Sequence, residues 1–178
     1  MRPVVVTAVL LLVVLMFTSD SAAWDPSEMC RTKYPAKPCK NTNRGDWLQM
    51  GDNYCVKAFF NTEHLGFFAA DRACKEYPNG HLVSIHNDDE LSIVQCAMYK
   101  ATTGKAHYWI GAFLTIRGSG LEWAWADNTK FDYSRWAGGQ PDNYQYSEGC
   151  VEMNYSDWAL WNDLNCKDKR PYVCAVKV

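Results

Sequence analysis

The chain has 178 residues, of which 48% are hydrophobic, and its 18 basic and 20 acidic residues leave a formal net charge of −2. A balance this close to neutral lacks the basic excess of a nucleic-acid-binding protein, so we exclude that class. The length fits one domain with a single sizeable core.

The amino-terminal residues predict a secretory signal peptide. Met1 and Arg2 precede an apolar run over residues 4–17, and small residues at 21–23 follow at cleavage spacing. The apolar run is too short to span a bilayer. We expect cleavage after Ala23, with residues 1–23 as signal peptide, a secreted extracellular product and no membrane insertion.

Residues 24–38 are interpreted as an N-terminal arm, ahead of a folded domain over residues 39–178. Three prolines punctuate the arm, and five basic residues with no acidic one lie between Arg31 and Arg44. Charged, proline-containing termini are usually solvated and mobile, which is the interpretation we favour. The alternative is that the arm contacts sulfated glycans.

The eight cysteines indicate disulfides. Their number is even, the chain is expected to be secreted, and no Cys-x-x-Cys pair occurs, which argues against zinc or redox chemistry. Spacing alone leaves the pairing open.

In chain order, the pattern predicts a hairpin over residues 47–60, a helix over residues 64–76 and a short strand over residues 81–85. Asn87-Asp-Asp-Glu90 is a capping-box pattern that starts a second helix running toward Thr103. Two inward stripes fit this helix: Leu91, Val94 and Met98, or Ile93, Val94 and Ala97. Neither stripe places Cys96 centrally, which favours a position that another chain can reach.

Paired strands are predicted over residues 108–113 and 121–125, and a last strand over residues 171–176. The second half of the chain then predicts a hairpin with strands over residues 150–154 and 158–161. Such a hairpin brings Glu148 close to Asn162 and Asp163, although they are far apart in sequence.

Five side chains in residues 140–163 carry oxygen donors, and none offers sulfur or imidazole: Gln140, Asp142, Glu148, Asn162 and Asp163. A hard cation such as Ca²⁺ takes 6–8 oxygens of these kinds, whereas zinc prefers Cys or His. The sequence therefore predicts a calcium site.

At these residues the chain resembles the C-type lectin family. The matching residues are Trp109-Ile-Gly111, Trp123, Trp125, Gln140-Pro-Asp142, Glu148, Cys150, Trp161-Asn-Asp163, Cys166 and Cys174. The resemblance spans roughly residues 39–178. It implies an α+β C-type lectin-like domain with two helices, two small antiparallel sheets and a long calcium-binding loop region, stapled by disulfides.

The resemblance also implies particular bonds. It implies the disulfides Cys39–Cys55, Cys74–Cys174 and Cys150–Cys166, and it leaves Cys30 and Cys96 either to bond each other or to join two chains as a disulfide-linked homo-oligomer. It implies a cis peptide bond between Gln140 and Pro141. The five oxygen donors become ligands of the family's sugar-binding calcium.

In the family, Gln-Pro-Asp accompanies galactose and N-acetylgalactosamine, whereas Glu-Pro-Asn accompanies mannose. Gln140-Pro-Asp142 is therefore interpreted as galactose-type, with galactose-type glycans as partners. We expect Gln140, Asp142, Glu148 and Asn162 to contact the sugar and Tyr144 to pack on its apolar face. Asn143 and Gly149 stand where acidic ligands of an auxiliary calcium would help, so one calcium is predicted.

The tryptophans Trp109, Trp123, Trp125 and Trp136 are interpreted as core rather than as a sugar platform. Asn154-Tyr-Ser156 is an N-glycosylation sequon, expected at the hairpin turn away from the calcium ligands.

An enzyme is the least favoured class. Gly-x-Ser-x-Gly, His-Glu-x-x-His and phosphate-loop motifs are absent, and the histidines show no ligand spacing. The rival to sugar binding is a lectin-like domain with a non-sugar ligand: a protein target such as a clotting or platelet factor, or ice or mineral.

Overall fold

The computed structural model describes residues 26–40 and 45–178, so the expected signal peptide lies outside the described residues. Its elements, in chain order, are α2 (Pro26–Thr32), β1 (Leu48–Met50), β2 (Tyr54–Phe59), α3 (Phe67–Lys75), β3 (Gly80–Leu82), α4 (Asp88–Ala101), β4 (Tyr108–Arg117), β5 (Gly120–Trp125), the 3-10 turn η1 (Tyr144–Tyr146), β6 (Cys150–Met153), β7 (Trp161–Leu164) and β8 (Tyr172–Lys177). Within this part of the chain, no helix is both long and apolar enough to cross a membrane.

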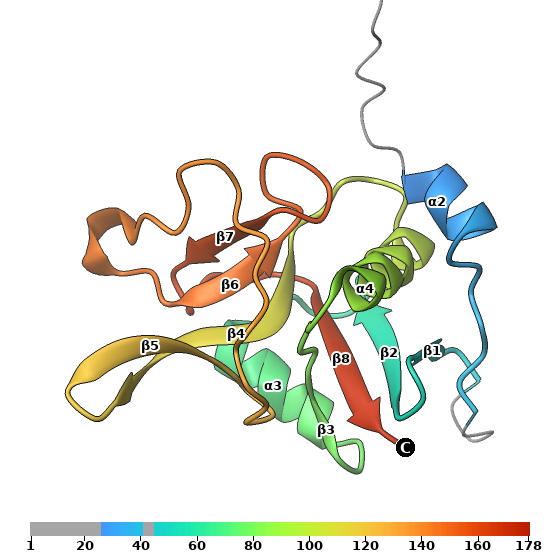
Figure 1. The fold of residues 1–178 in the computed structure, drawn as a ribbon, viewed down its shortest axis with the longest axis horizontal. Helices are drawn as coiled ribbons and strands as arrows, with labels where there is room; N and C mark the ends of the chain where they lie inside the picture. Colours follow the sequence, from blue (N-terminus) through green and yellow to red (C-terminus); the bar gives the residue numbers. More distant parts are fainter. Residues whose placement is uncertain (1–25, 41–44) are drawn as a thin grey trace, which may run out of the picture.

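The last strand, β8, lies at the centre of the sheet (Figure 1). It pairs antiparallel with β2 and β3, and parallel with β4 through Trp109 and Tyr172. The strand order is β1-β2-β8-β4-β6-β7, with β3 added on β8 and β5 on β4. The α+β fold is confirmed, but the two expected small sheets form one network because the β4–β8 contact joins them.

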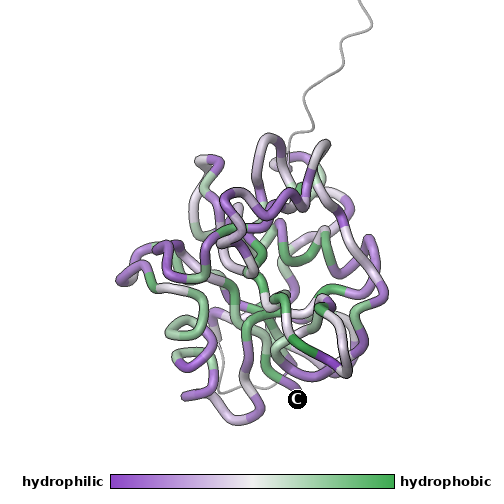
Figure 2. Tube along the Cα trace, turned by 90° about the vertical axis from the view of Figure 1, so that its left-hand side faces the viewer, coloured by the Kyte–Doolittle hydropathy of each residue, from purple (hydrophilic) through white to green (hydrophobic). Residues whose placement is uncertain are grey.

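Alternate residues of β8 explain the two-sided core. Val173 and Ala175 belong to a cluster with Val94 and Met98 of α4. Their neighbours Cys174 and Val176 belong to a second cluster around α3. Because successive strand residues point to opposite faces, α3 and α4 cover opposite faces of this strand. Hydrophobic segments accordingly run through the middle of the molecule, with hydrophilic ones outside (Figure 2).

The Trp109-Ile-Gly111 sequence lies where β4 passes closely beside the segment after β3. A Cβ on Gly111 would lie 2.5 Å from the carbonyl oxygen of Leu82. The Gly111 amide also donates to the carbonyl oxygen of Val83 at 2.8 Å. A larger residue at this position would push the two segments apart.

The second helix begins as the sequence predicts. Asn87 Oδ1 accepts from the amide of Glu90 at 2.9 Å, and Glu90 Oε2 accepts from the amide of His86 at 2.8 Å. Of the two candidate stripes, Leu91, Val94 and Met98 are all buried, whereas Ile93 is only half-buried. The first stripe is therefore confirmed.

Residues 31–38 of the expected arm are largely exposed, in line with a solvated segment, but the arm also contacts the folded domain. Residues 26–32 form α2, which lies against α4 (Figure 1), and a disulfide joins Cys30 to Cys96. Farther along, the Tyr34 hydroxyl donates to Asp89, and Pro38 bridges to Leu48. Sequence spacing alone could not reveal the disulfide that holds α2.

The bond between Cys30 and Cys96 also removes the expected basis for a disulfide-linked oligomer. Cys96 is 5% exposed, and no free cysteine remains in the described residues, which include all eight cysteines. The preference for a Cys96 reachable by another chain is therefore wrong, because α2 covers it.

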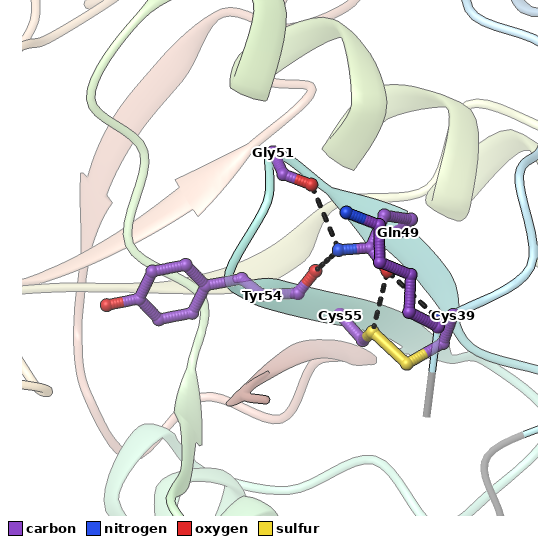
Figure 3. Close-up of a disulfide and its surroundings, with 6 residues drawn as sticks. Cys39, Gln49, Gly51, Tyr54 and Cys55 are labelled. Atoms are coloured by element: carbon purple, nitrogen blue, oxygen red, sulfur yellow. Dashed lines mark hydrogen bonds between the residues drawn. A yellow bond between two sulfur atoms is a disulfide. The ribbon is translucent and has the colours of Figure 1, made fainter. Parts of the chain in front are cut away.

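The other disulfides are the three pairs that the family resemblance implies: Cys39–Cys55, Cys74–Cys174 and Cys150–Cys166. Cys39–Cys55 holds the segment before β1 to the first hairpin (Figure 3). In that hairpin the Gln49 Nε2 donates to the carbonyl oxygens of Gly51 and Tyr54, which closes the turn between β1 and β2.

The β6–β7 hairpin forms, but its second strand begins later than expected. β7 starts at Trp161 rather than at residue 158, and Met153 pairs with Trp161. Residues 154–160 instead make a wider turn, in which the amides of Asn154 and Tyr155 both donate to the carbonyl oxygen of Leu160. This shift places Asn162 and Asp163 inside the strand rather than after it.

Candidate functional site

Three carboxylates, from β7 and from the segment before β6, lie close together. In Figure 1 these two segments lie on the side of the molecule away from α2 and β1. One oxygen each of Asp142, Glu148 and Asp163 lies within 4.8 Å of the others. Asp142 is exposed, Glu148 is half-buried and Asp163 is buried. Like charges this close repel one another, so the group favours a cation between them.

Asp163 fixes the loop to the sheet. Its Oδ1 accepts from the amide of Asp142 at 3.1 Å, and its Oδ2 accepts from the amide of Asn143 at 2.8 Å. Since Asp163 lies in β7, residues 142 and 143 are held against a rigid strand. A carboxylate that accepts two backbone hydrogen bonds is held in one orientation.

Glu148 closes the same loop from its other end. Its Oε2 accepts from the amide of Tyr144 at 2.9 Å, and its own amide donates to Asn143 Oδ1 at 3.2 Å. Burial, together with the nearby Asp163 and Asp142, raises the pKa of Glu148 above its usual value. Without a cation, the site therefore favours a proton on this carboxyl more than water does.

Gln140 contributes a buried acceptor that has no partner among residues 26–40 and 45–178. It precedes a cis peptide bond to Pro141, and its amide donates to the carbonyl oxygen of Ala137 at 2.9 Å. Its side-chain Oε1 is buried without a hydrogen-bond partner. A buried carbonyl oxygen without a hydrogen-bond partner lowers the stability of the fold, and coordination to a cation would offset that cost.

Asn162 lies on β7, opposite Glu152 of β6. Its side-chain Nδ2 donates to Glu152 Oε1 at 3.1 Å. Burial alone would raise the pKa of Glu152, but hydrogen bonds from His107 and Arg170 outweigh it and hold that pKa below its usual value.

Glu152 was missed by the sequence reasoning. It is 1% exposed, and its position within an apolar strand carries no ligand spacing that could have singled it out. The available signal was the presence of a charged residue in a predicted buried strand, since buried carboxylates are rare unless paired.

The donor set fits calcium. The carboxylate cluster and the unpaired Gln140 oxygen supply oxygen of the kinds that Ca²⁺ prefers, and neither sulfur nor imidazole belongs to the group. The structure brings together in one group Asp142, Glu148 and Asp163; Asn162 adjoins Asp163 on β7, and Gln140 precedes Asp142 by two residues.

Two tyrosines are displayed beside this group. Tyr144 is 64% exposed and Tyr146 is 96% exposed, and both belong to η1 between Asn143 and Glu148. Asn143, Gln145 and Tyr146 have positive φ angles of 46°, 54° and 54°. This backbone turns the two rings outward, and Tyr146 was not among the predicted site residues.

The tryptophans follow the core interpretation only in part. Trp109 and Trp125 are buried, at 0% and 1% exposure. Trp123 and Trp136 are half-buried and pack on each other, with ring centroids 5.0 Å apart. These four rings therefore form the core and its border.

The sequon asparagine, Asn154, lies in the turn between β6 and β7 and is buried there. Asn154 is 0% exposed. Its Nδ2 donates to the carbonyl oxygen of Ala106 at 3.1 Å, and its Oδ1 accepts from the amide of Ala159 at 2.9 Å. These two hydrogen bonds stabilise the turn between β6 and β7.

Comparison with known proteins places the chain in a family. The model of the lectin C-type domain matches residues 63–176. C-type isolectin Sp-CL4 of Scorpaena plumieri is 37% identical over 145 residues, which cover 79% of this chain and 96% of that protein. C-type lectin PAL of Bitis arietans is 35% identical over 134 residues, covering 74% and 96%. The chain belongs to the C-type lectin domain family.

Solved structures agree with this assignment. The C-type lectin CEL-I from Cucumaria echinata superposes with a TM-score of 0.65 at 28% identity, covering 78% of this chain and 97% of that one. Herring type II antifreeze protein superposes with a TM-score of 0.62 at 27% identity, covering 79% and 99%. The family is a non-enzymatic, carbohydrate-binding fold, which confirms that the chain is not an enzyme.

Proposed function

We propose that the chain is a secreted, calcium-dependent lectin that binds galactose-type sugars through a Ca²⁺ ion. The observation that carries this proposal is the oxygen-only group at the β6–β7 end, where three carboxylates lie within 4.8 Å and the buried Gln140 Oε1 lacks a partner. Gln140, Asp142, Glu148, Asn162 and Asp163 would hold the ion. When bound, calcium supplies coordination positions for two adjacent sugar hydroxyls.

The side chains around the ion would have different roles in sugar binding. Asp142 is exposed, and its carboxylate accepts hydrogen bonds from sugar hydroxyls, whereas the Gln140 amide also offers donors. Asp163 orients the loop through the amides of residues 142 and 143. The exposed ring of Tyr144 covers the apolar face that galactose presents.

The order of amide and acid supports the galactose assignment. In a Glu-Pro-Asn sequence the acid precedes the proline and the amide follows it. Here the amide of Gln140 comes first and the acid of Asp142 second, so the hydrogen-bond donor lies on the other side of the proline. Each position can therefore bind a different sugar hydroxyl. Galactose-type glycans on glycoproteins or cell surfaces are the proposed partners.

Retention on immobilised galactose and immobilised mannose, with calcium and then with EDTA, tests this function. We expect retention on galactose and release by EDTA. Retention on mannose alone would overturn the sugar assignment. Calcium binding without retention on either column would favour the non-sugar class, which shares this fold in herring type II antifreeze protein.

We also propose that the mature chain begins at Trp24. Secretion from a eukaryotic host followed by mass spectrometry of the product tests this boundary. Because α2 and Cys30 lie against α4, we propose that the folded domain includes residues 26–38, rather than beginning at residue 39.

A further inference from the structure

Two buried polar side chains face each other across the β6–β7 hairpin. The strand register pairs Glu152 with Asn162, and Nδ2 of Asn162 donates to Glu152 Oε1 at 3.1 Å. Glu152 is 1% exposed and Asn162 is 6% exposed, so water has little access to either group. At such depth each group depends on its protein partner.

The other oxygen of Glu152 is held from two further segments. Arg170 Nε donates to Glu152 Oε2 at 2.7 Å, and His107 Nδ1 lies 3.3 Å from the same oxygen. Arg170 is itself fixed, because its backbone exchanges two hydrogen bonds of 3.1 Å with Leu65. The Glu152 carboxylate is therefore clamped in one orientation.

An ionised carboxylate only accepts hydrogen bonds, so Glu152 favours the nitrogen end of the Asn162 carboxamide over its oxygen end. The Nδ2 group must turn toward Glu152, since the reverse orientation would set Asn162 Oδ1 against a negative oxygen. Because the amide is planar, Oδ1 then points away from Glu152. The Glu152–Asn162 pair thus decides which atom Asn162 offers on its other side.

We propose that Glu152 is a positioning residue for the calcium site: it fixes the Asn162 carboxamide so that Oδ1, rather than Nδ2, is presented to the ion. This role rests on the proposed function, because it assumes that Asn162 is a ligand. Partners that orient a metal ligand typically contribute about 10- to 100-fold to metal affinity.

Glu152→Gln tests the role with almost no change of volume. The new side chain has one acceptor and one donor group, and Arg170 takes the acceptor because its guanidinium can only donate. The amide nitrogen of the substituted side chain would then face Asn162, whose Oδ1 would turn to accept from it. We expect calcium affinity, measured by calorimetry, to fall about 10- to 100-fold.

A matched control separates this effect from general loss of stability. Asp71 is also buried and paired with two basic side chains, Lys75 at 2.6 Å and His81 at 3.5 Å, and it accepts from the amide of Leu82. It lies on α3, outside the group of calcium ligands. Asp71→Asn should lower the melting temperature in EDTA while leaving the calcium dissociation constant unchanged.

A second substitution should rescue the first. Asn162→Asp replaces the carboxamide by a carboxylate, which presents oxygen on both sides and needs no orientation. In the Glu152→Gln background it accepts from the new amide and restores calcium affinity toward the wild-type value. In the wild-type background it sets two carboxylates against each other and should weaken folding.

The side-chain amide resonances of Asn162 provide a readout that needs no calcium. In the wild-type protein with EDTA, NMR should show one Asn162 Nδ2 proton protected from solvent exchange by Glu152, with that protection changed in Glu152→Gln. An unchanged calcium dissociation constant in Glu152→Gln, or no rescue by Asn162→Asp, would overturn the positioning role alone. Absence of calcium binding by the wild-type protein would overturn the proposed function and this role together.

Discussion

At the scale of single residues, the site is organised around carboxylates that form no ion pair with any residue the structure describes. Asp142, Glu148 and Asp163 gather within 4.8 Å, and the loop's own amides satisfy oxygens of Glu148 and Asp163. Backbone N–H groups orient these oxygens but carry no full positive charge. The remaining negative charge is what a divalent ion would balance.

Asp142 is the residue whose substitution separates sugar binding from folding. It is exposed, and its backbone amide, rather than its side chain, makes the bond to Asp163. Asp142→Asn should therefore abolish or redirect sugar binding with a melting temperature in EDTA close to that of the wild type. Sugar-column retention and a thermal scan measure the two effects, and unchanged galactose affinity would refute the ligand role.

Tyr144 should act on the sugar and not on the ion. Its ring is 64% exposed, and only its backbone amide contacts Glu148. Tyr144→Ala should weaken galactose binding by about 3- to 10-fold, as expected for loss of one aromatic contact. The calcium dissociation constant should stay the same, so equal losses of sugar and calcium would mean that Tyr144 is structural.

Acid should release calcium through Glu148. Its pKa is raised above the usual 4.5 by burial and by Asp163 and Asp142, so protons compete for this ligand at a higher pH than for an ordinary carboxylate. Calorimetry from pH 7 toward pH 5 should show a weakening calcium affinity. A raised carboxyl pKa stabilises the calcium-free fold on acidification, so protonation of Glu148 would weaken calcium binding without unfolding the protein. A dissociation constant that stays flat over this range would contradict the ligand role.

At the scale of elements, local chemistry predicted most of what the structure contains. The first hairpin, α4 and its cap, and the paired strands β4 and β5 follow from turn residues, a capping pair and alternating apolar residues, which act within a few positions of each other.

The elements that sequence reasoning missed depend on distant partners. Charge and proline predicted a solvated arm, but the disulfide from Cys30 to Cys96 and contact with α4 stabilise α2. The start of β7 was placed too early because Trp158 and Trp161 are equally apolar. Pairing with Met153 selects Trp161.

The same distinction applies to the site. Oxygen-bearing side chains near Gln140-Pro-Asp142 predicted a candidate ligand set, because ligand chemistry is visible in residue types. Glu152 and Arg170 were not predicted, since their contact depends on the strand register between β6 and β7 and on the path of the chain before β8. The sequon likewise gave no sign that the Asn154 side chain is buried.

The disulfide of α2 should stabilise the fold without serving the site. Replacing Cys30 and Cys96 together by Ser opens a link with a sequence separation of 66 residues, for which the chain-entropy model gives at most about 4 kcal/mol. We expect a lower free energy of unfolding in urea and an unchanged calcium dissociation constant. An unchanged unfolding midpoint would show that α2 is held by packing alone.

At the scale of the whole molecule, the two ends have different tasks. The sheet and the disulfides Cys74–Cys174 and Cys30–Cys96 hold β8, α3, α4 and α2 together, whereas Cys150–Cys166 lies at the base of the β6–β7 hairpin, beside the proposed ligands. A rigid base of this kind would support a loop that holds the proposed calcium ligands in fixed positions.

A single sugar site of this size binds weakly, and linking sites can add about 10²–10⁴ in apparent affinity. Because all eight cysteines pair within the chain, any such linkage uses non-covalent contacts or several glycans on one surface. Avidity would therefore depend on surface contacts between chains or on clustered glycans, and not on disulfides between chains.

The group at the β6–β7 end is proposed to bind calcium and, through that ion, sugar. A calorimetric titration of the wild-type protein with galactose, first in calcium and then in EDTA, tests this proposal. We predict a measurable heat of binding with calcium and none with EDTA. Equal binding of galactose in both buffers would contradict a calcium-bridged site, whatever sugar the protein prefers.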